Sequence, residues 1–418
     1  MTPRTILYTG KGGVGKTSVA ASTALAIAQR GLRTVVLSTD PAHSLSDSLE
    51  TPLGPSPVRV ADNLWGQEVQ AEAEMERHWN AVQRWLTSVL SDRGVDRILA
   101  EELTVPPGMD EIFALLQLKR HHESDEFDVI VVDCAPTGET LRLLSFPEVA
   151  RWWLEKVFPW EKRILTAARP FARTMLDLPL PGNDVLAEVQ GLVRNLVEMS
   201  EILRNRERAS IRLVMNPERM VIKEAQRTFT YLNLYGYLTD AVVVNRVFPD
   251  AVEGGYFAAW RDVQQEQVEL VEEAFAPVPV LRAPFFEQEV IGPAMLARLG
   301  SEVFDGHEPQ AVLYRDLSQE LEMLDDSAVL RLKIPFVEKA EIKLKKVGLE
   351  LIVRVGSHKR NIMLPTALAS YRPREARFEG GALVVRFEEE PAPNENGPHE
   401  NAAHEQAHDP VAGRTTAR

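Results

Sequence analysis

Eight residues near the N-terminus constrain the fold more than any other part of the chain. They read Gly-Lys-Gly-Gly-Val-Gly-Lys-Thr and occupy positions 10–17. A short β-type run, 5–9, precedes them, and an uncharged, alanine-rich stretch, 17–29, follows. Strand, glycine-rich loop and helix in this order predict a phosphate-binding loop, because backbone N–H groups and a helix N-terminus can surround a polyphosphate. The alternative is a glycine-rich turn without a ligand.

Three side chains of this loop suit a nucleoside triphosphate. Lys16 is placed to reach the β- and γ-phosphates, and the hydroxyl of Thr17 to ligate Mg²⁺. A second lysine, Lys11, adds positive charge that is costly unless an anion is bound; the alternative is that it is simply solvated. We therefore expect ATP and Mg²⁺ as cofactors. The nucleotide contacts expected from this loop are Gly10, Lys11, Gly12, Gly13, Val14, Gly15, Lys16, Thr17 and Ser18.

Two further strand-like runs end in an acidic residue. The run 33–39 is followed by Asp40, and the apolar run 126–132 by Asp133. The carboxyl ends of parallel strands form the ligand-binding edge of an open α/β sheet. We expect Asp133 to join Thr17 at Mg²⁺. We expect Asp40 either to orient or deprotonate the attacking water, or to hold a water bound to Mg²⁺. The alternative is that Asp40 only caps a helix or a turn.

Several motifs resemble those of one family of ATPases over roughly residues 4–300. The loop with its extra lysine resembles the deviant phosphate loop of ArsA, the nitrogenase iron protein and MinD/ParA. Segment 39–47 (T-D-P-A-H-S-L-S-D), segment 107–111 (P-G-M-D-E) and segment 133–144 (D-C-A-P-T-G-E-T-L-R-L-L) are similar to elements of ArsA and tail-anchored-protein-targeting ATPases. In that family 39–47 and 133–144 correspond to switch segments, although Cys134 and Glu139 replace a threonine and a histidine.

This resemblance implies an ATP-hydrolysing homodimer. Lys11 would contact the nucleotide of the partner subunit, so the expected catalytic residues are Asp40, Lys11 and Lys16. Asn245 stands where the family has an asparagine that hydrogen-bonds adenine, and Pro284 and Phe285 match the segment that covers the base. The family's E-T-E-R nucleotide contact appears only as E-A-Q-R at 224–227, so it is not carried over.

The order of patterns predicts an α/β chain with a second, all-β domain. We expect a P-loop NTPase domain with a mostly parallel sheet at 1–305, with a helical insert at about 146–208, and a linker at 306–328. Period-two alternation then predicts a small β-sandwich at 329–388, which resembles the α-crystallin-like domain of small heat-shock proteins; an unrelated β domain is the alternative. The polar tail, 389–418, should be disordered.

The segment before the strand that ends in Asp133 gives two further predictions. Residues 68–122 are predicted to be helical, with a break at 106–111. His121 and His122 at the end of this block are interpreted as an exposed pair at a helix C-terminus rather than metal ligands.

Composition limits the partners. The net charge of −14 argues against a nonspecific nucleic-acid or anionic-membrane binder, and no run reaches transmembrane length. With no signal-peptide pattern and a single cysteine, Cys134, the expected location is cytoplasmic. As(III) and Sb(III) prefer several thiolates, so one cysteine favours a different cargo.

The apolar insert, with Trp152, Trp153 and Trp160, suggests either plain core packing or a surface for a hydrophobic protein client or a membrane-protein partner. We expect a targeting or chaperone-like ATPase. The alternatives are an arsenite or antimonite efflux ATPase acting with a membrane permease, and a nucleotide-gated switch with a protein partner.

Overall fold

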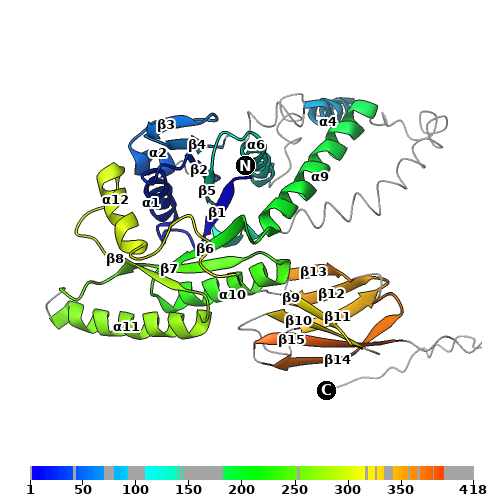
Figure 1. Cartoon of the computed structure of the whole chain (residues 1–418). Helices are drawn as coiled ribbons and strands as arrows, with labels where there is room; N and C mark the ends of the chain where they lie inside the picture. Colours follow the sequence, from blue (N-terminus) through cyan, green and yellow to red (C-terminus); the bar gives the residue numbers. More distant parts are fainter. Residues whose placement is uncertain are drawn as a thin grey trace, which may run out of the picture.

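The computed structural model describes residues 2–40, 44–69, 80–92, 109–138, 140–141, 144, 182–251, 255–315, 319–324, 327–333, 342–355, 358–364, 368–379 and 381–389. These residues form an α/β domain, followed along the chain by a smaller all-β domain (Figure 1). The predicted fold class is confirmed, including the mostly parallel sheet.

The α/β domain is built on one eight-stranded sheet in the described part of the chain, with the order β3-β4-β2-β5-β1-β6-β7-β8. Neighbouring strands are parallel except for the edge pair β3 and β4. Its strands are β1 (Arg4–Thr9), β2 (Thr34–Ser38), β3 (Val58–Ala61), β4 (Leu64–Glu68), β5 (Val129–Asp133), β6 (Ala209–Met215), β7 (Thr239–Val247) and β8 (Val280–Pro284). Every residue of β1, β2, β5 and β6 is buried, as expected for parallel strands covered on both faces.

Helices cover both faces of this sheet (Figure 1). On one face, α1 (Lys16–Ala28) packs against α2 (Ser44–Leu49) and α12 (Gly292–Val303). On the other lie α6 (Met109–Glu123), α9 (Asn183–Arg204), α10 (Arg219–Tyr235) and α11 (Gly255–Phe275), while α4 (Asn80–Asp92) packs on α9. This division follows from right-handed crossovers, because the chain moves in one direction across the sheet from β1 to β3 and in the opposite direction from β4 to β8.

The prediction for residues 68–122 was only partly correct. Glu68 lies in β4, and neither β3 nor β4 was predicted as a strand. Helices α4 and α6 are present, whereas residues 70–79 and 93–108 lie outside the described residues. The prediction of an exposed histidine pair was wrong for His121, which is 4% exposed, hydrogen-bonds the Gln67 side chain and packs edge-on against Phe127. Burial lowers the pKa of His121 to about 4.

Helix α9 accounts for the end of the predicted insert. The side chains of Leu192, Leu196, Met199 and Leu203 form a stripe at helical spacing and are buried in the core of the α/β domain. This stripe therefore packs internally. The first part of the insert, 146–181, including its tryptophans, lies outside the described residues.

The second domain consists of two antiparallel sheets. One has the order β14-β15-β10-β9 and the other β11-β12-β13. Its strands are β9 (Gln319–Met323), β10 (Ser327–Lys333), β11 (Ile342–Val347), β12 (Glu350–Val355), β13 (His358–Met363), β14 (Tyr371–Glu379) and β15 (Ala382–Glu389). β9 and the first residues of β10 fall inside the predicted linker, so the sheet begins earlier than the sequence suggested.

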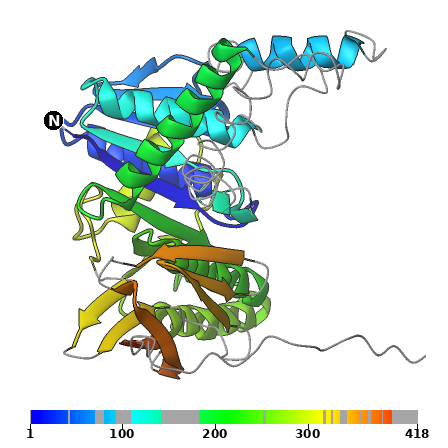
Figure 2. The ribbon, with the colours of Figure 1, turned by 90° about the vertical axis from the view of Figure 1, so that its right-hand side faces the viewer.

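Helix α10 joins the two domains. It contacts β10 and β13, and Tyr231 packs against the hydrophobic cores of both domains. Both views show the second domain beside this helix (Figures 1 and 2).

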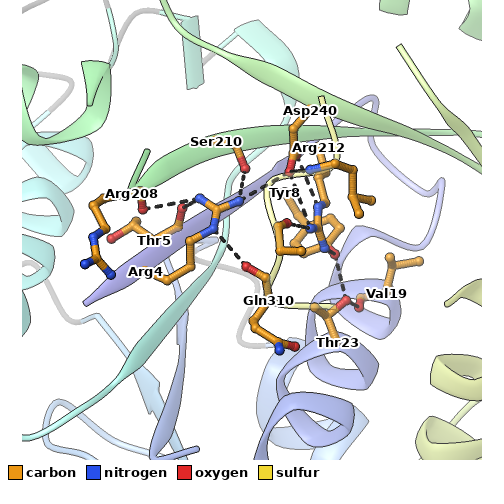
Figure 3. A network of polar contacts seen from close by, with 12 residues as sticks. Arg4, Thr5, Tyr8, Val19, Thr23, Arg208, Ser210, Arg212, Asp240 and Gln310 are labelled. Carbon is orange, nitrogen blue, oxygen red and sulfur yellow. Dashed lines mark hydrogen bonds and ion pairs between the residues drawn. The ribbon is translucent and has the colours of Figure 1, made fainter. Parts of the chain in front are cut away.

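A buried ionic network ties β1, β6 and β7 to the segment after α12 (Figure 3). The carboxylate of Asp240 lies 3.3 Å from the guanidinium groups of both Arg4 and Arg212. These two arginines also donate to the carbonyl oxygens of Gln310 and Ala311, which fixes this segment against the sheet. Burial lowers the pKa of Arg4 to about 10. For Arg212, burial acts in the same direction, but Tyr8 and Asp240 outweigh it and raise its pKa.

Candidate active site

The phosphate loop begins where β1, in the middle of the sheet, ends, and it leads directly into α1. Gly13 and Gly15 have positive φ angles of 80° and 88°, which favour glycine. A Cβ on Gly10 would overlap the backbone carbonyl of Val214 in β6, and one on Gly15 would overlap the Asn245 side chain. The loop geometry therefore depends on glycine at these positions.

The polar side chains of the loop point to different places. Lys16 is buried, and its Nζ donates to the carbonyl oxygen of Lys11 (3.3 Å), so its side chain curls over the loop. The hydroxyl of Thr17 lies 3.1 Å from that of Ser44, at the start of α2. Lys11 is exposed. Lys16 is therefore buried against the loop, whereas Lys11 faces solvent.

Asp133 lies beside the loop in a setting that fits a divalent cation. It pairs with Tyr8 in the parallel register of β5 and β1, and it is fully buried. Neither carboxylate oxygen accepts a hydrogen bond within the described part of the chain. Burial raises the pKa of Asp133 to about 7, although the nearby Thr17 and Lys16 oppose the rise. A buried carboxylate without partners is costly, and a cation held by Asp133 and Thr17 would relieve that cost.

The two predicted switch segments are hydrogen-bonded to each other. The amide of Thr39 donates to the carbonyl oxygen of Asp133 (2.9 Å), and its hydroxyl accepts from the amide of Ala135 (3.2 Å). Asp40 follows directly, half-buried, and its charge contributes to the raised pKa of Asp133. Asp40 is therefore close to the predicted cation site. Residues 41–43 and 139 lie outside the described residues.

A cavity of about 510 Å³ adjoins the loop. Its walls bring together predicted contacts from distant parts of the sequence: Gly15, Ser18, Asn245, Pro284 and Phe285. Asn245 also binds within the chain, since its Nδ2 donates to the carbonyl oxygen of Val14 (2.8 Å) and its Oδ1 accepts from the amide of Arg246 (2.9 Å). The contact of Asn245 with adenine remains a prediction, and its visible role is to support the loop.

Sequence reasoning missed two residues of this region. Glu224 on α10 accepts a hydrogen bond from the hydroxyl of Thr137 (2.6 Å) and lies 3.9 Å from Nζ of Lys11. In the sequence, Glu224 was marked only by the incomplete match of residues 224–227 to the family's E-T-E-R motif. Gln264 on α11 accepts from the amide of Phe248 (2.6 Å) and donates to the carbonyl oxygen of Arg246 (3.0 Å). It therefore fixes the turn after Asn245, and no local sequence signal marked it.

The central strand, the glycine loop opening α1 and the acid at the end of β5 define a P-loop nucleotide hydrolase. Two family models identify the family within this class to which the chain belongs. Residues 3–305 match the model of the anion-transporting ATPase (ArsA ATPase), and residues 325–387 match the HSP20-like domain found in ArsA. The chain belongs to the ArsA ATPase family and is an ATPase.

Similar proteins are known from several bacteria. The putative arsenical pump-driving ATPase 1 of Aquifex aeolicus is 37% identical over 392 residues, covering 91% of this chain and 99% of the relative. The putative arsenical pump-driving ATPase of Chlorobaculum tepidum is 36% identical, covering 92% and 96%. Protein Rv2184c of Mycobacterium tuberculosis is 30% identical, covering 93% and 96%. The similarity therefore extends over both domains.

A membrane span requires a long helix of apolar residues. None of the described helices combines the length and the apolar character needed to cross a bilayer.

Proposed function

We propose that this ATPase acts as a homodimer that couples ATP hydrolysis to the handling of a hydrophobic protein client. In each subunit Lys16 binds the phosphates, and Asp133 and Thr17 hold Mg²⁺, which would neutralise charge on the phosphate oxygens. Asp40 aligns the attacking water, and Lys11 contacts the nucleotide of the partner subunit. The observation that carries the ATP part is the buried carboxylate of Asp133 beside the phosphate loop, whose oxygens accept no hydrogen bond from the residues that the structure describes.

The single cysteine supports a protein client over a metalloid. Cys134 is 1% exposed, and burial, together with Asp133, raises the pKa of its thiol. Metal-binding and reactive cysteines show the opposite, a lowered pKa and access to solvent. The second candidate is an arsenite or antimonite efflux ATPase with a membrane permease, and the printed names of the Aquifex and Chlorobaculum relatives favour it. We also propose a cytoplasmic location, which is compatible with either function.

The first experiment tests Asp40 and then uses it to trap the client. Asp40→Asn should leave ATP binding nearly intact while slowing hydrolysis by at least ~10²-fold, as expected for a positioned base. Asp62→Asn is the matched control, since Asp62 is exposed in the turn between β3 and β4 and should not matter. Equal losses of binding and turnover in Asp40→Asn would contradict its role.

The ATP-loaded Asp40→Asn protein then serves as bait for mass spectrometry of bound proteins. Membrane-protein tails would support the targeting function, and a single integral permease would support the pump. Arsenite provides the opposing test. A severalfold rise in turnover that disappears in Cys134→Ser would overturn the client proposal.

Mixing two inactive variants tests whether Lys11 acts across the dimer. In a mixed dimer of Lys11→Ala and Asp40→Asn, the nucleotide on the Lys11→Ala subunit still faces an intact Asp40 and the partner's lysine. Equal mixing should therefore restore about a quarter of the wild-type rate, since half the dimers carry one complete site. No restoration, or full activity of the wild type as a diluted monomer, would rule out the role in trans.

A further inference from the structure

Two functional segments of the α/β domain meet on one carboxylate of α10. The hydroxyl of Thr137, four residues after Asp133, donates to Oε1 of Glu224 (2.6 Å). Nζ of Lys11, in the phosphate loop, lies 3.9 Å from Oε2 of the same side chain. The two oxygens of Glu224 are thus divided between the phosphate loop and the second predicted switch segment.

The backbone that carries Glu224 is firmly held. Val221, Ile222 and Ala225 on the same helix are buried in the core of the α/β domain. Further along α10, Tyr231 packs against both cores. Helix α10 is therefore a fixed support, and its carboxylate remains in place when the loops that contact it change conformation.

The contact with Lys11 is weak enough to be exchanged. The two side chains are 45% and 36% exposed, and ion pairs as exposed as this one contribute little. A triphosphate carries several negative charges and offers a lysine shorter, charge-assisted hydrogen bonds. Lys11 should therefore leave Glu224 when ATP is near and return when the site is empty.

We propose that Glu224 is a positioning residue of this ATPase. It retains Lys11 and Thr137 while no nucleotide is available to Lys11, and it releases Lys11 to the ATP that Lys11 contacts. The inference rests on the proposed function, in which Lys11 contacts a nucleotide. Because the ATP that uses Lys11 must first draw it away from Glu224, Glu224 lowers the affinity for this ATP and thereby sets the ATP concentration at which Lys11 becomes available.

The test measures ATP affinity rather than activity alone. Glu224→Gln keeps the size of the side chain and an acceptor for Thr137, but it removes the charge that holds Lys11. In the full-length protein, the Kd for Mg·ATP from fluorescence titration should fall about two- to fivefold, the range set by exposed ion pairs. KM should fall with Kd, while kcat changes less.

Two controls separate the contact from a general effect of charge. Glu266→Gln removes the same charge from α11, where the side chain is exposed and lines neither cavity beside the loop, and should leave Kd unchanged. In a Lys11→Ala background, Glu224→Gln should no longer change Kd, since the two residues act through one contact. Glu224→Asp, which retains the charge but is one methylene shorter, should also tighten binding and serves if the glutamine variant folds poorly.

An unchanged or weakened ATP affinity in Glu224→Gln would overturn the inference. An equal gain in the Lys11→Ala background, or in Glu266→Gln, would overturn it too. These results are independent of the client and of the mixed-dimer experiment, because the cycle measures a contact within one chain. Failure of this inference and failure of the proposed function are therefore distinguishable.

Discussion

Replacement of Asp240 by asparagine should destabilise the protein far more than the loss of an exposed ion pair. Asp240 is fully buried between Arg4 and Arg212, and its Oδ2 also accepts from the amide of Leu313 (3.2 Å). An asparagine would direct an NH₂ donor at groups that are themselves donors, and it would leave two buried guanidinium groups without a counter-charge. Breaking such a buried pair costs about 3–5 kcal/mol.

This cost translates into a measurable shift of the melting temperature. With an unfolding entropy of about 2.1 cal/mol/K per residue and roughly 300 residues in the α/β domain, 3–5 kcal/mol corresponds to a drop of about 5–8 °C. The comparison is Asp128→Asn, because Asp128 pairs with Arg33 at 2.7 Å but both side chains are partly exposed. That change should cost at most ~1 kcal/mol, or less than about 2 °C.

Differential scanning calorimetry of both variants without nucleotide, at one scan rate and pH 7.5, provides the measurement. If Asp240→Asn and Asp128→Asn lower the melting temperature equally, the argument from buried charge is refuted.

The remaining predictions concern three other positions. His121 is neutral in the native state, with a pKa of about 4, and its pKa is about 6.5 when the chain is unfolded. Its contribution of ~3 kcal/mol to the free energy of unfolding is therefore complete above pH 6.5 and is lost as the pH falls towards 4. His121→Gln should therefore flatten the pH dependence of the urea midpoint over this interval, and an unchanged slope would contradict it. Asp133→Asn should raise the thermal stability of the nucleotide-free protein at pH 8, because the buried carboxylate, with a pKa of about 7, is charged there, while Mg²⁺-dependent ATP binding is lost. A less stable nucleotide-free variant would argue against that reasoning. Gly15→Ala should weaken ATP binding at least about tenfold, since strain at such a φ costs ~1–3 kcal/mol and the new Cβ meets Asn245; normal binding by equilibrium dialysis would exclude this.

Local patterns in the sequence predicted the parts of the fold that have a local cause. The glycine loop between β1 and α1 was recognisable because strand, turn and helix signals follow one another without interruption. The acid at the end of β5 was recognisable because a fully buried parallel strand reads as one apolar run. The all-β character of the second domain was likewise indicated by alternation with period two.

What the sequence failed to predict depends on contacts between distant residues. The edge hairpin of β3 and β4 is short, and its inner strand ends in the polar residues Gln67 and Glu68, which nevertheless are buried. Burial of His121 follows from its bond to Gln67, 54 residues earlier. The role of Glu224 became visible only when the fold placed α10 beside Lys11 and Thr137. Pairings of this kind leave no periodic signal.

The contact of Tyr231 with both hydrophobic cores has a practical consequence for dissecting this protein. A fragment cut after the α/β domain would expose the apolar side of Tyr231, and the surface of α10 that now faces β10 and β13, to water. Such a fragment should self-associate or be captured by chaperones, so its behaviour in a truncation experiment would report a newly uncovered surface rather than the intrinsic properties of the domain. Substituting polar side chains on that surface before truncation would restore a meaningful comparison.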